Sequence, residues 1–219
     1  MAIKLKVYTS RLNCGGVVWA LISTVAAVAA GIGFYLPYWL EGKLRSSADD
    51  SIDAEISFGT FRRCNNYYHQ SVDGEDGVIS GCGRYTTFDA IPSLWWRVST
   101  IVIGTGCGVA LLMAFLTVFA ICLMDVFSKS SARISGALQG CAGLLIGGGC
   151  ALYPIGWDNA EVSSVCGNTV KPYNPGMCSI GWAFYLTAIG GALTFISCFL
   201  SCNAVRYKKF GNINYHGFT

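Results

Sequence analysis

Four long stretches of the chain are mostly apolar and carry no charge. Asp, Glu, Lys and Arg are absent from residues 12–40, 98–123, 134–155 and 172–205. Each stretch exceeds the ~20 apolar residues that an α-helix needs to cross the ~30 Å hydrocarbon core of a bilayer. The pattern predicts four membrane-spanning helices, at about residues 17–35, 98–123, 134–153 and 182–202.

The first stretch has an alternative interpretation as a cleaved signal peptide. Three basic residues precede it, and cleavage would follow Ala29. A signal peptide, however, has an apolar core of only ~7–15 residues. Here apolar residues continue through Leu36 without a polar break. We therefore interpret residues 17–35 as a retained helix.

The charged residues between the predicted spans indicate their orientation, because short cytoplasmic flanks carry an excess of Lys and Arg. Three flanks, which together hold one acid (Asp125), carry this excess: Lys4, Lys6, Arg11, Lys129, Arg133, Arg206, Lys208 and Lys209. The other two loops hold most of the acidic residues. We expect both termini in the cytoplasm, with residues 36–97 and 154–181 outside the cell. The basic tail then reports topology and does not predict nucleic-acid binding.

The composition agrees with a membrane protein. Hydrophobic residues make up 53% of the 219 residues and charged residues 12%, against about 25% charged in a typical soluble domain.

The eleven cysteines fall into two groups under this topology. Four lie in the outside loops, where an oxidising environment allows three connectivities. We expect Cys64 to pair with Cys82 and Cys166 with Cys178, because each pair then closes its own loop. Such closures contribute roughly 3 kcal/mol apiece in the chain-entropy account.

The other seven cysteines lie in or beside the predicted spans. Most suit a role as small apolar filler. Four lie at or near the predicted inner membrane face and are candidates for palmitoylation: Cys14, Cys122, Cys198 and Cys202. No Cys-x-x-Cys spacing occurs in the chain, so no metal site is predicted.

The first outside loop, about 60 residues long, exceeds a simple connector. Apolar and small polar residues alternate between Ala54 and Phe61, which is typical of a strand. We expect a small antiparallel sheet, held by the disulfide of this loop. The acidic run from Asp49 to Glu55 is interpreted as a solvated surface, with a partner surface as the alternative.

Aromatic residues gather at the outer ends of the predicted spans. Rings with one wet edge prefer the membrane–water boundary, and we assign most of this set to such a belt: Tyr35, Tyr38, Trp39, Trp95, Trp96, Tyr153, Trp157 and Trp182. Trp39 and Trp157 are also expected to pack against the sheet.

Small residues recur at helix-packing intervals within the predicted spans. The third span contains the longest series: Gly136, Gly140, Gly143 and Gly147. Small residues four apart allow two helix backbones to approach closely. We expect them to pack the helices of one bundle; the alternative is a stripe that faces a second protein.

The residues that would mark a transporter or an enzyme are missing from the sequence. The predicted spans hold no Asp, Glu, Lys, Arg or His, and Gln139 is their strongest polar group, whereas transport pathways usually need ionisable side chains. No nucleophile elbow, phosphate loop or zinc-protease motif occurs. His69 and Cys64 could suggest a ligand pair, but Cys64 is better used in a disulfide. We expect no catalysis, no cofactor and a function in binding.

Several motifs in the predicted outside loops resemble one family. Trp39 and the segment Phe58-Gly59-Thr60-Phe61, followed by two cysteines, are similar to the Trp…Gly-Leu-Trp…Cys…Cys pattern of the claudin superfamily. Thr60 and Phe61 replace its Leu and second Trp, which argues against a true claudin. The segments around Trp157 and Trp182, Tyr-Pro-Ile-Gly-Trp-Asp and Cys-Ser-Ile-Gly-Trp-Ala-Phe, resemble the lipoma HMGIC fusion partner-like (LHFPL) tetraspan family.

This resemblance implies a claudin-like fold, an all-α transmembrane four-helix bundle with a small extracellular antiparallel β-sheet. It also implies a plasma-membrane auxiliary subunit that binds ion channel or receptor subunits, either ligand-gated receptors or the mechanotransduction channel. The sequence does not choose between these partners. A claudin-like cell–cell adhesion or barrier protein, which would associate with itself, is the alternative.

Four aromatic residues are candidates for contact with a partner. Tyr67 and Tyr68 are expected at a loop tip, where both side chains cannot easily enter one small core. Trp95 and Trp96 lie at the outer end of the second span. For each tryptophan singly, a position at the lipid boundary is the simpler interpretation.

Overall fold

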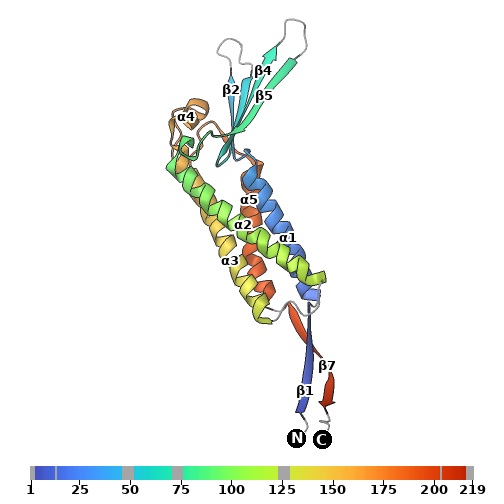
Figure 1. Cartoon of the computed structure of the whole chain (residues 1–219). Helices are drawn as coiled ribbons and strands as arrows, with labels where there is room; N and C mark the ends of the chain where they lie inside the picture. Colours follow the sequence, from blue (N-terminus) through green and yellow to red (C-terminus); the bar gives the residue numbers. More distant parts are fainter. Residues whose placement is uncertain are drawn as a thin grey trace.

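The structure is a computed structural model that describes residues 3–12, 14–45, 52–70, 76–122, 129–202 and 204–215. Two predicted features lie partly outside these residues: the acidic run, at residues 49–51, and the end of the second predicted span, at residue 123. The predicted fold is confirmed: a bundle of long helices carries a small antiparallel sheet at one end (Figure 1).

Within the described residues, four helices are long and apolar enough to cross a bilayer: α1 (Cys14–Tyr35), α2 (Leu94–Cys122), α3 (Lys129–Leu152) and α5 (Trp182–Ser201). The protein is therefore a multi-pass membrane protein. Helices α2 and α3 begin earlier than their charge-free stretches, because isolated charged residues do not end a helix. At the start of α2, the Arg97 guanidinium donates to the Ile91 carbonyl at 3.0 and 3.1 Å and contacts Asp89 at 3.2 Å.

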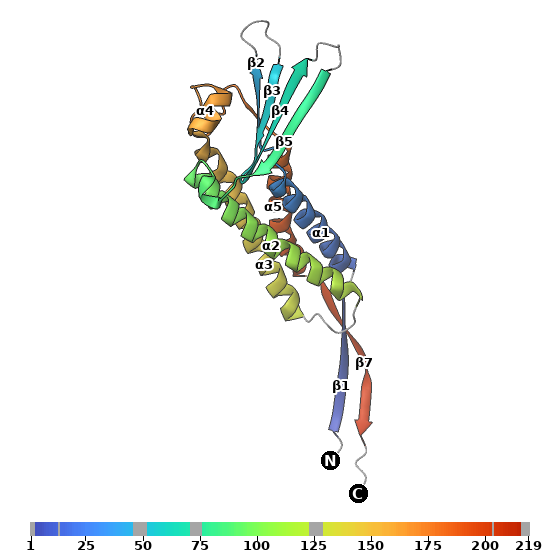
Figure 2. The ribbon, with the colours of Figure 1, turned by 45° about the horizontal axis from the view of Figure 1, so that its top comes forward.

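The four helices form a ring in which α1 and α3 lie diagonally opposite. Helix α1 packs against α2 and α5, and α3 packs against the same two helices (Figures 1 and 2). Gln139 of α3, only 1% exposed, bridges the diagonal. Its Oε1 accepts from Trp19 Nε1 at 2.8 Å, and its Nε2 donates to Ser23 Oγ at 3.0 Å. The strongest polar group of the predicted spans thus joins two helices that are not neighbours.

Small residues bring the helix backbones together within the chain. A Cβ added at Gly143 would lie 2.6 Å from the Phe195 backbone nitrogen of α5, and one at Gly190 would lie 2.6 Å from that of Ala30 in α1. The interpretation of the glycines as internal packing positions is confirmed for Gly136, Gly140 and Gly143. A Cβ at Gly147 would meet nothing within 4 Å.

The sheet is antiparallel in the order β5-β4-β3-β2-β6. Its strands are β2 (Leu40–Arg45), β3 (Ile52–Phe58), β4 (Arg62–Gln70), β5 (Asp76–Arg84) and β6 (Ser179–Ile180). Four come from the first long loop and β6 comes from the second. The predicted strand at residues 54–61 ends earlier, at Phe58, because Gly59 begins a turn to β4.

A second β-structure at the opposite end of the bundle was not predicted from the sequence. β1 (Ile3–Leu12) pairs antiparallel with β7 (Val205–Tyr215) to form a two-stranded ribbon that projects from the helices (Figure 2). The two segments are about 200 residues apart, so their pairing is set by the adjacent ends of α1 and α5.

Substitution of a packing glycine tests the bundle. Gly143→Ala should lower the thermal unfolding midpoint of the detergent-purified protein, because its Cβ would meet α5 backbone that cannot move independently. The cost of such overpacking is about 1–3 kcal/mol. The matched control is Gly147→Ala, where space is open, and it should not lower the midpoint. Equal destabilisation by both variants would contradict the assigned helix contacts.

Candidate partner-binding surface

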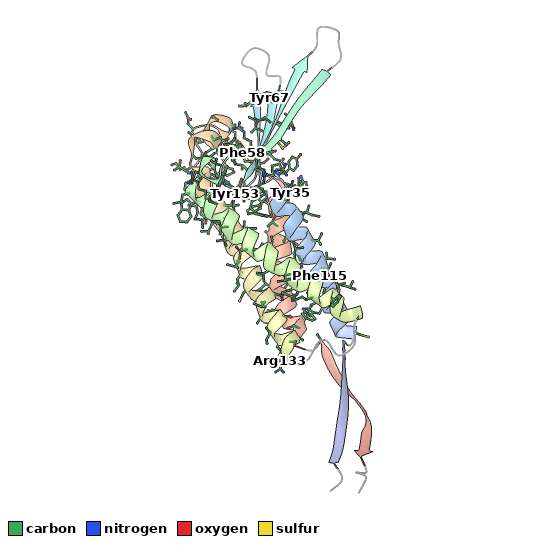
Figure 3. All side chains as sticks on the ribbon, in the orientation of Figure 1. Tyr35, Phe58, Tyr67, Phe115, Arg133 and Tyr153 are labelled. Atoms are coloured by element: carbon green, nitrogen blue, oxygen red, sulfur yellow. A yellow bond between two sulfur atoms is a disulfide. The ribbon has the colours of Figure 1, made fainter. Side chains whose placement is uncertain are left out.

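Buried aromatic side chains hold the sheet on the helix bundle. Trp39, Trp96, Tyr153 and Phe58 are all fully buried. The Tyr153 ring centroid lies 4.9 Å from that of Trp39 and 5.2 Å from that of Trp96, and Phe58 of β3 lies 6.0 Å from Trp96. Figure 3 shows Phe58 and Tyr153 at the junction between sheet and helices. This cluster gives the sheet a rigid base.

The predicted membrane-boundary belt is therefore only partly correct. Trp39, Trp96, Tyr153 and Trp157 are in the core instead. Four belong to the surface: Tyr35, Trp95 and Trp182 are exposed, and Tyr38 is half-buried. A run of aromatic residues at a helix end does not reveal which of them another part of the chain will cover.

The family-motif positions have clear packing roles. Gly59 allows the β3–β4 turn to lie against α1's end, since a Cβ there would come within 2.9 Å of Pro37 Cα. Phe61 packs beside Phe34, with ring centroids 5.1 Å apart. The Trp39 indole donates to the Gly33 carbonyl at 2.8 Å, and Trp157 is 1% exposed.

Polar contacts of Glu161 hold the sheet against the second of the predicted outside loops. This loop contains a 3-10 helix, η2 (Tyr153–Trp157), and a short helix, α4 (Ala160–Cys166), whose N-cap Asn159 accepts from the backbone of Glu161. The Glu161 carboxylate pairs with Arg63 of β4 and accepts from the Tyr85 hydroxyl at 3.2 Å. Burial, and then the neighbouring Glu161 carboxylate, raise the pKa of Tyr85, so its hydroxyl remains a donor.

Both predicted disulfides are present. Cys64 of β4 lies directly opposite Cys82 of β5 and is bonded to it, and Cys166 at the end of α4 is bonded to Cys178. The second bond lies against Gly42, where a Cβ would come within 2.5 Å of Cys178 Sγ. The first disulfide therefore joins two paired strands, and the second packs against β2.

The palmitoylation candidates differ in accessibility. Cys14 and Cys202 are exposed and Cys198 is half-buried, while the side chain of Cys122 lies outside the described residues. Within the described part of the chain, no group of three His, Cys, Asp or Glu side chains is placed to hold a metal ion.

The partner-binding candidates are placed in three different environments. Tyr67 is 49% exposed on the sheet (Figure 3), and Trp95 is 42% exposed at the start of α2. Trp96 is fully buried, so the expectation of a partner contact does not hold for it. Tyr67 and Tyr68 lie inside β4 and not at a loop tip; the side chain of Tyr68 is outside the described residues. The predicted loop tip is instead a strand, because β4 pairs with β3 on one side and with β5 on the other.

A groove that the sequence did not predict lies beside β2. Its volume is about 950 Å³, and its lining includes Tyr38, Glu41, Lys43, Met177 and Trp182. The Tyr38 and Trp182 rings stack with centroids 5.8 Å apart. The groove combines residues from both loops and from the start of α5, so no local sequence signal marks it.

Comparison with known proteins agrees with this architecture. The model of the family described as lipoma HMGIC fusion partner-like protein matches residues 15–206. The chain belongs to this family. It is 34% identical over 204 residues to the human LHFPL tetraspan subfamily member 2 protein, with 88% of each chain covered. It is 32% identical to the zebrafish (Danio rerio) member 2a protein, again with 88% of each covered.

More distant relatives within the family are also similar along most of the chain. The zebrafish LHFPL tetraspan subfamily member 3 protein is 30% identical over 199 residues, which cover 89% of this chain and 83% of the relative. The LHFPL resemblance of the loop motifs is therefore confirmed, and the match extends across all four membrane-spanning helices.

A double-mutant cycle tests the Arg63–Glu161 ion pair between the sheet and α4. Arg63→Met and Glu161→Gln, singly and together, should show a coupling of about 1–3 kcal/mol in the free energy of unfolding, because both side chains are mostly buried. The control cycle uses Lys43→Met and Glu55→Gln, an exposed pair at 3.1 Å, which should couple by no more than about 1 kcal/mol. Similar coupling energies in the two cycles would show that the Arg63–Glu161 pair contributes no more than an exposed surface ion pair.

Proposed function

We propose that this LHFPL-family protein is a non-catalytic auxiliary subunit of an ion channel or receptor complex in the plasma membrane. It would bind the channel or receptor subunits and support their assembly, trafficking or localisation. The observation that carries the proposal is the rigid, disulfide-linked sheet, which presents exposed aromatic side chains and a groove beyond the ends of the membrane-spanning helices. The resemblance of this protein to auxiliary subunits of the LHFPL family supports the same role.

The exposed aromatic residues of this end suit contact with another protein. Interfaces gain most of their free energy from a few aromatic or arginine anchors on a preorganised surface. Tyr67 lies on a paired strand, and Trp95 lies in the first turn of α2, beside the buried aromatic base. Both therefore have rigid backbones and exposed rings. We assign Tyr67 and Trp95 to the partner-binding surface.

We further propose that the sheet is extracellular and that both termini are cytoplasmic. The basic flanks favour this orientation, and the β1–β7 ribbon, which lies at the end opposite the sheet, contains six basic residues and no acidic one. The disulfides of the sheet end require an oxidising compartment. The basic residues at one end and the disulfides at the other are two independent features that favour the same topology.

Surface labelling of intact cells tests this topology. An epitope inserted between β2 and β3 should be accessible to antibody without permeabilisation, whereas one fused to either terminus should require permeabilisation. Detection of a terminal tag on intact cells would contradict the proposed orientation.

Purification in mild detergent, followed by mass spectrometry, tests the auxiliary role. Channel or receptor subunits should accompany the wild-type protein, and Tyr67→Ser should reduce their recovery about tenfold, the loss expected when an anchor worth about 1.4 kcal/mol is removed. The control is Tyr185→Ser, at a comparably exposed tyrosine in α5, which should retain them.

Equal recovery with Tyr67→Ser would place the contact elsewhere, for example along the helices. Recovery of only further copies of this chain, from the same and from adjoining cells, would contradict the auxiliary role and favour the adhesion or barrier alternative.

A further inference from the structure

The β2 strand has a free edge along most of its length. Its first two residues, Leu40 and Glu41, pair with Ile180 and Ser179 of β6. From Gly42 onward β2 pairs only with β3 among the residues that the structure describes. An unpaired strand edge presents alternating backbone donors and acceptors to any chain that lies beside it.

The groove of about 950 Å³ borders this same edge. One wall is formed by β2 and β3, and the other includes Val165 and Met177 from the segment closed by the second disulfide. Met177 is 79% exposed. The volume lies at the upper end of the range for ligand sites, which suits several residues of an extended chain better than a small metabolite.

One acidic side chain that lines the groove, Glu41, has no hydrogen-bond or ion-pair partner among the described residues. No hydrogen bond or ion pair among the described residues reaches the Glu41 carboxylate, whereas the neighbouring Lys43 is already paired with Glu55 at 3.1 Å. Burial, and then the Glu55 carboxylate, raise the pKa of Glu41, and Lys43 opposes the rise. The negative charge of Glu41 is therefore incompletely compensated within the chain.

The carboxylate lies close to the backbone that leads into the exposed aromatic stack. A Cβ at Gly181 would come within 2.8 Å of Glu41 Oε1, which places this oxygen next to the residue that precedes Trp182. The Trp182 ring, 52% exposed, stacks on Tyr38. Glu41 and Trp182 both line the groove, and a carboxylate and an indole ring within one groove can bind a Lys or Arg side chain by an ion pair and a cation–π contact.

From these features we infer that the groove binds an extended, basic segment of the partner protein, which adds as a strand to the free edge of β2 and places a Lys or Arg side chain between Glu41 and Trp182. This inference rests on the proposed auxiliary function and specifies the chemistry of the partner. Backbone pairing would supply affinity and the basic side chain would supply the register, as in other cases of strand addition.

A bound lipid tail explains the groove less well. Polar side chains line it, including those of Lys43, Glu55 and Asn66, and an acyl chain would remove them from water without offering any hydrogen bond in return. By contrast, the crevice of about 310 Å³ between α1 and α2 is lined by residues such as Val28, Ile32 and Leu111. That crevice suits lipid, and the groove suits a peptide.

Synthetic peptides test the inference on the full-length protein purified in nanodiscs. The probe is a peptide of about ten alternating Thr and Val residues with one central Arg, and binding is followed by fluorescence anisotropy up to about 1 mM. This peptide should bind at least about tenfold more tightly than a version with central Gln. N-methylation of alternate peptide amides on the β2-facing side should abolish binding, because it removes the backbone donors.

Variants of the protein then assign the basic side chain to Glu41. Glu41→Gln should remove the preference for Arg over Gln, whereas Asp158→Asn, at an exposed acid that is not part of the groove lining, should retain it. Glu41→Lys should prefer a peptide with central Glu, which guards against a loss caused by misfolding. Equal binding of the Arg and Gln peptides to the wild type, unchanged binding after N-methylation, or no binding up to about 1 mM would each overturn the inference.

The same variants separate this inference from the proposed function. If Glu41→Gln recovers channel or receptor subunits at the wild-type level while Tyr67→Ser loses them, the auxiliary role stands and the groove inference fails. If the wild-type protein recovers no such subunits but binds the Arg peptide with the stated preferences, the auxiliary role fails and the groove remains a peptide site.

Discussion

The packing of Tyr153 against Trp39, edge to face, and against Trp96, stacked, determines how the rest of the sheet end is built. These three rings come from the first residue of η2, the residue before β2 and the first turn of α2, and all are fully buried. Truncation of a buried aromatic side chain of this kind typically costs about 3–5 kcal/mol. Because the rings connect three separate segments, they position the sheet, the η2–α4 loop and the α2 helix start relative to one another.

The surface features depend on that base. Phe58 extends the cluster into β3, and the Arg63–Glu161 pair ties β4 to α4 above it. With the sheet and α4 held together, the space beside β2 remains a groove. The two disulfides stabilise these segments within each loop, whereas the aromatic cluster and the ion pair connect the loops. The disulfides alone would therefore not produce the proposed binding surface.

The membrane-spanning part is held together by different forces. Lipid tails are as apolar as the helix surfaces, so burial of leucine or valine contributes little to helix association there. Close backbone contacts at Gly143 and Gly190 supply dispersion, and Gln139 supplies hydrogen bonds between diagonal helices. This division explains why the spans contain so many small residues and so few polar ones. Their outward faces remain apolar, as the exposed Leu21 and Phe115 illustrate.

Local patterns in the sequence determined the features that depend on the solvent around each segment. Charge-free stretches identify four spans because a charge in hydrocarbon is costly. The positions of Cys64, Cys82, Cys166 and Cys178 predict their pairing because each pair closes a short loop. The motifs around Trp157 and Trp182 point to the LHFPL family, and the family match confirms it.

Only the tertiary structure distinguished Trp95 from Trp96, because both occupy the same helix end and only one faces the sheet and Tyr153. The sequence also could not place Tyr67 within the paired strand β4. It could not identify the partner of Arg63 either, because Glu161 is 98 residues away. An Asn-x-Glu sequence at Asn159 does signal a helix start, but nothing local connects that helix to β4. The groove and the β1–β7 ribbon depend in the same way on strands brought together by the helix bundle, since a strand's hydrogen-bonding partner is not encoded in its own residues.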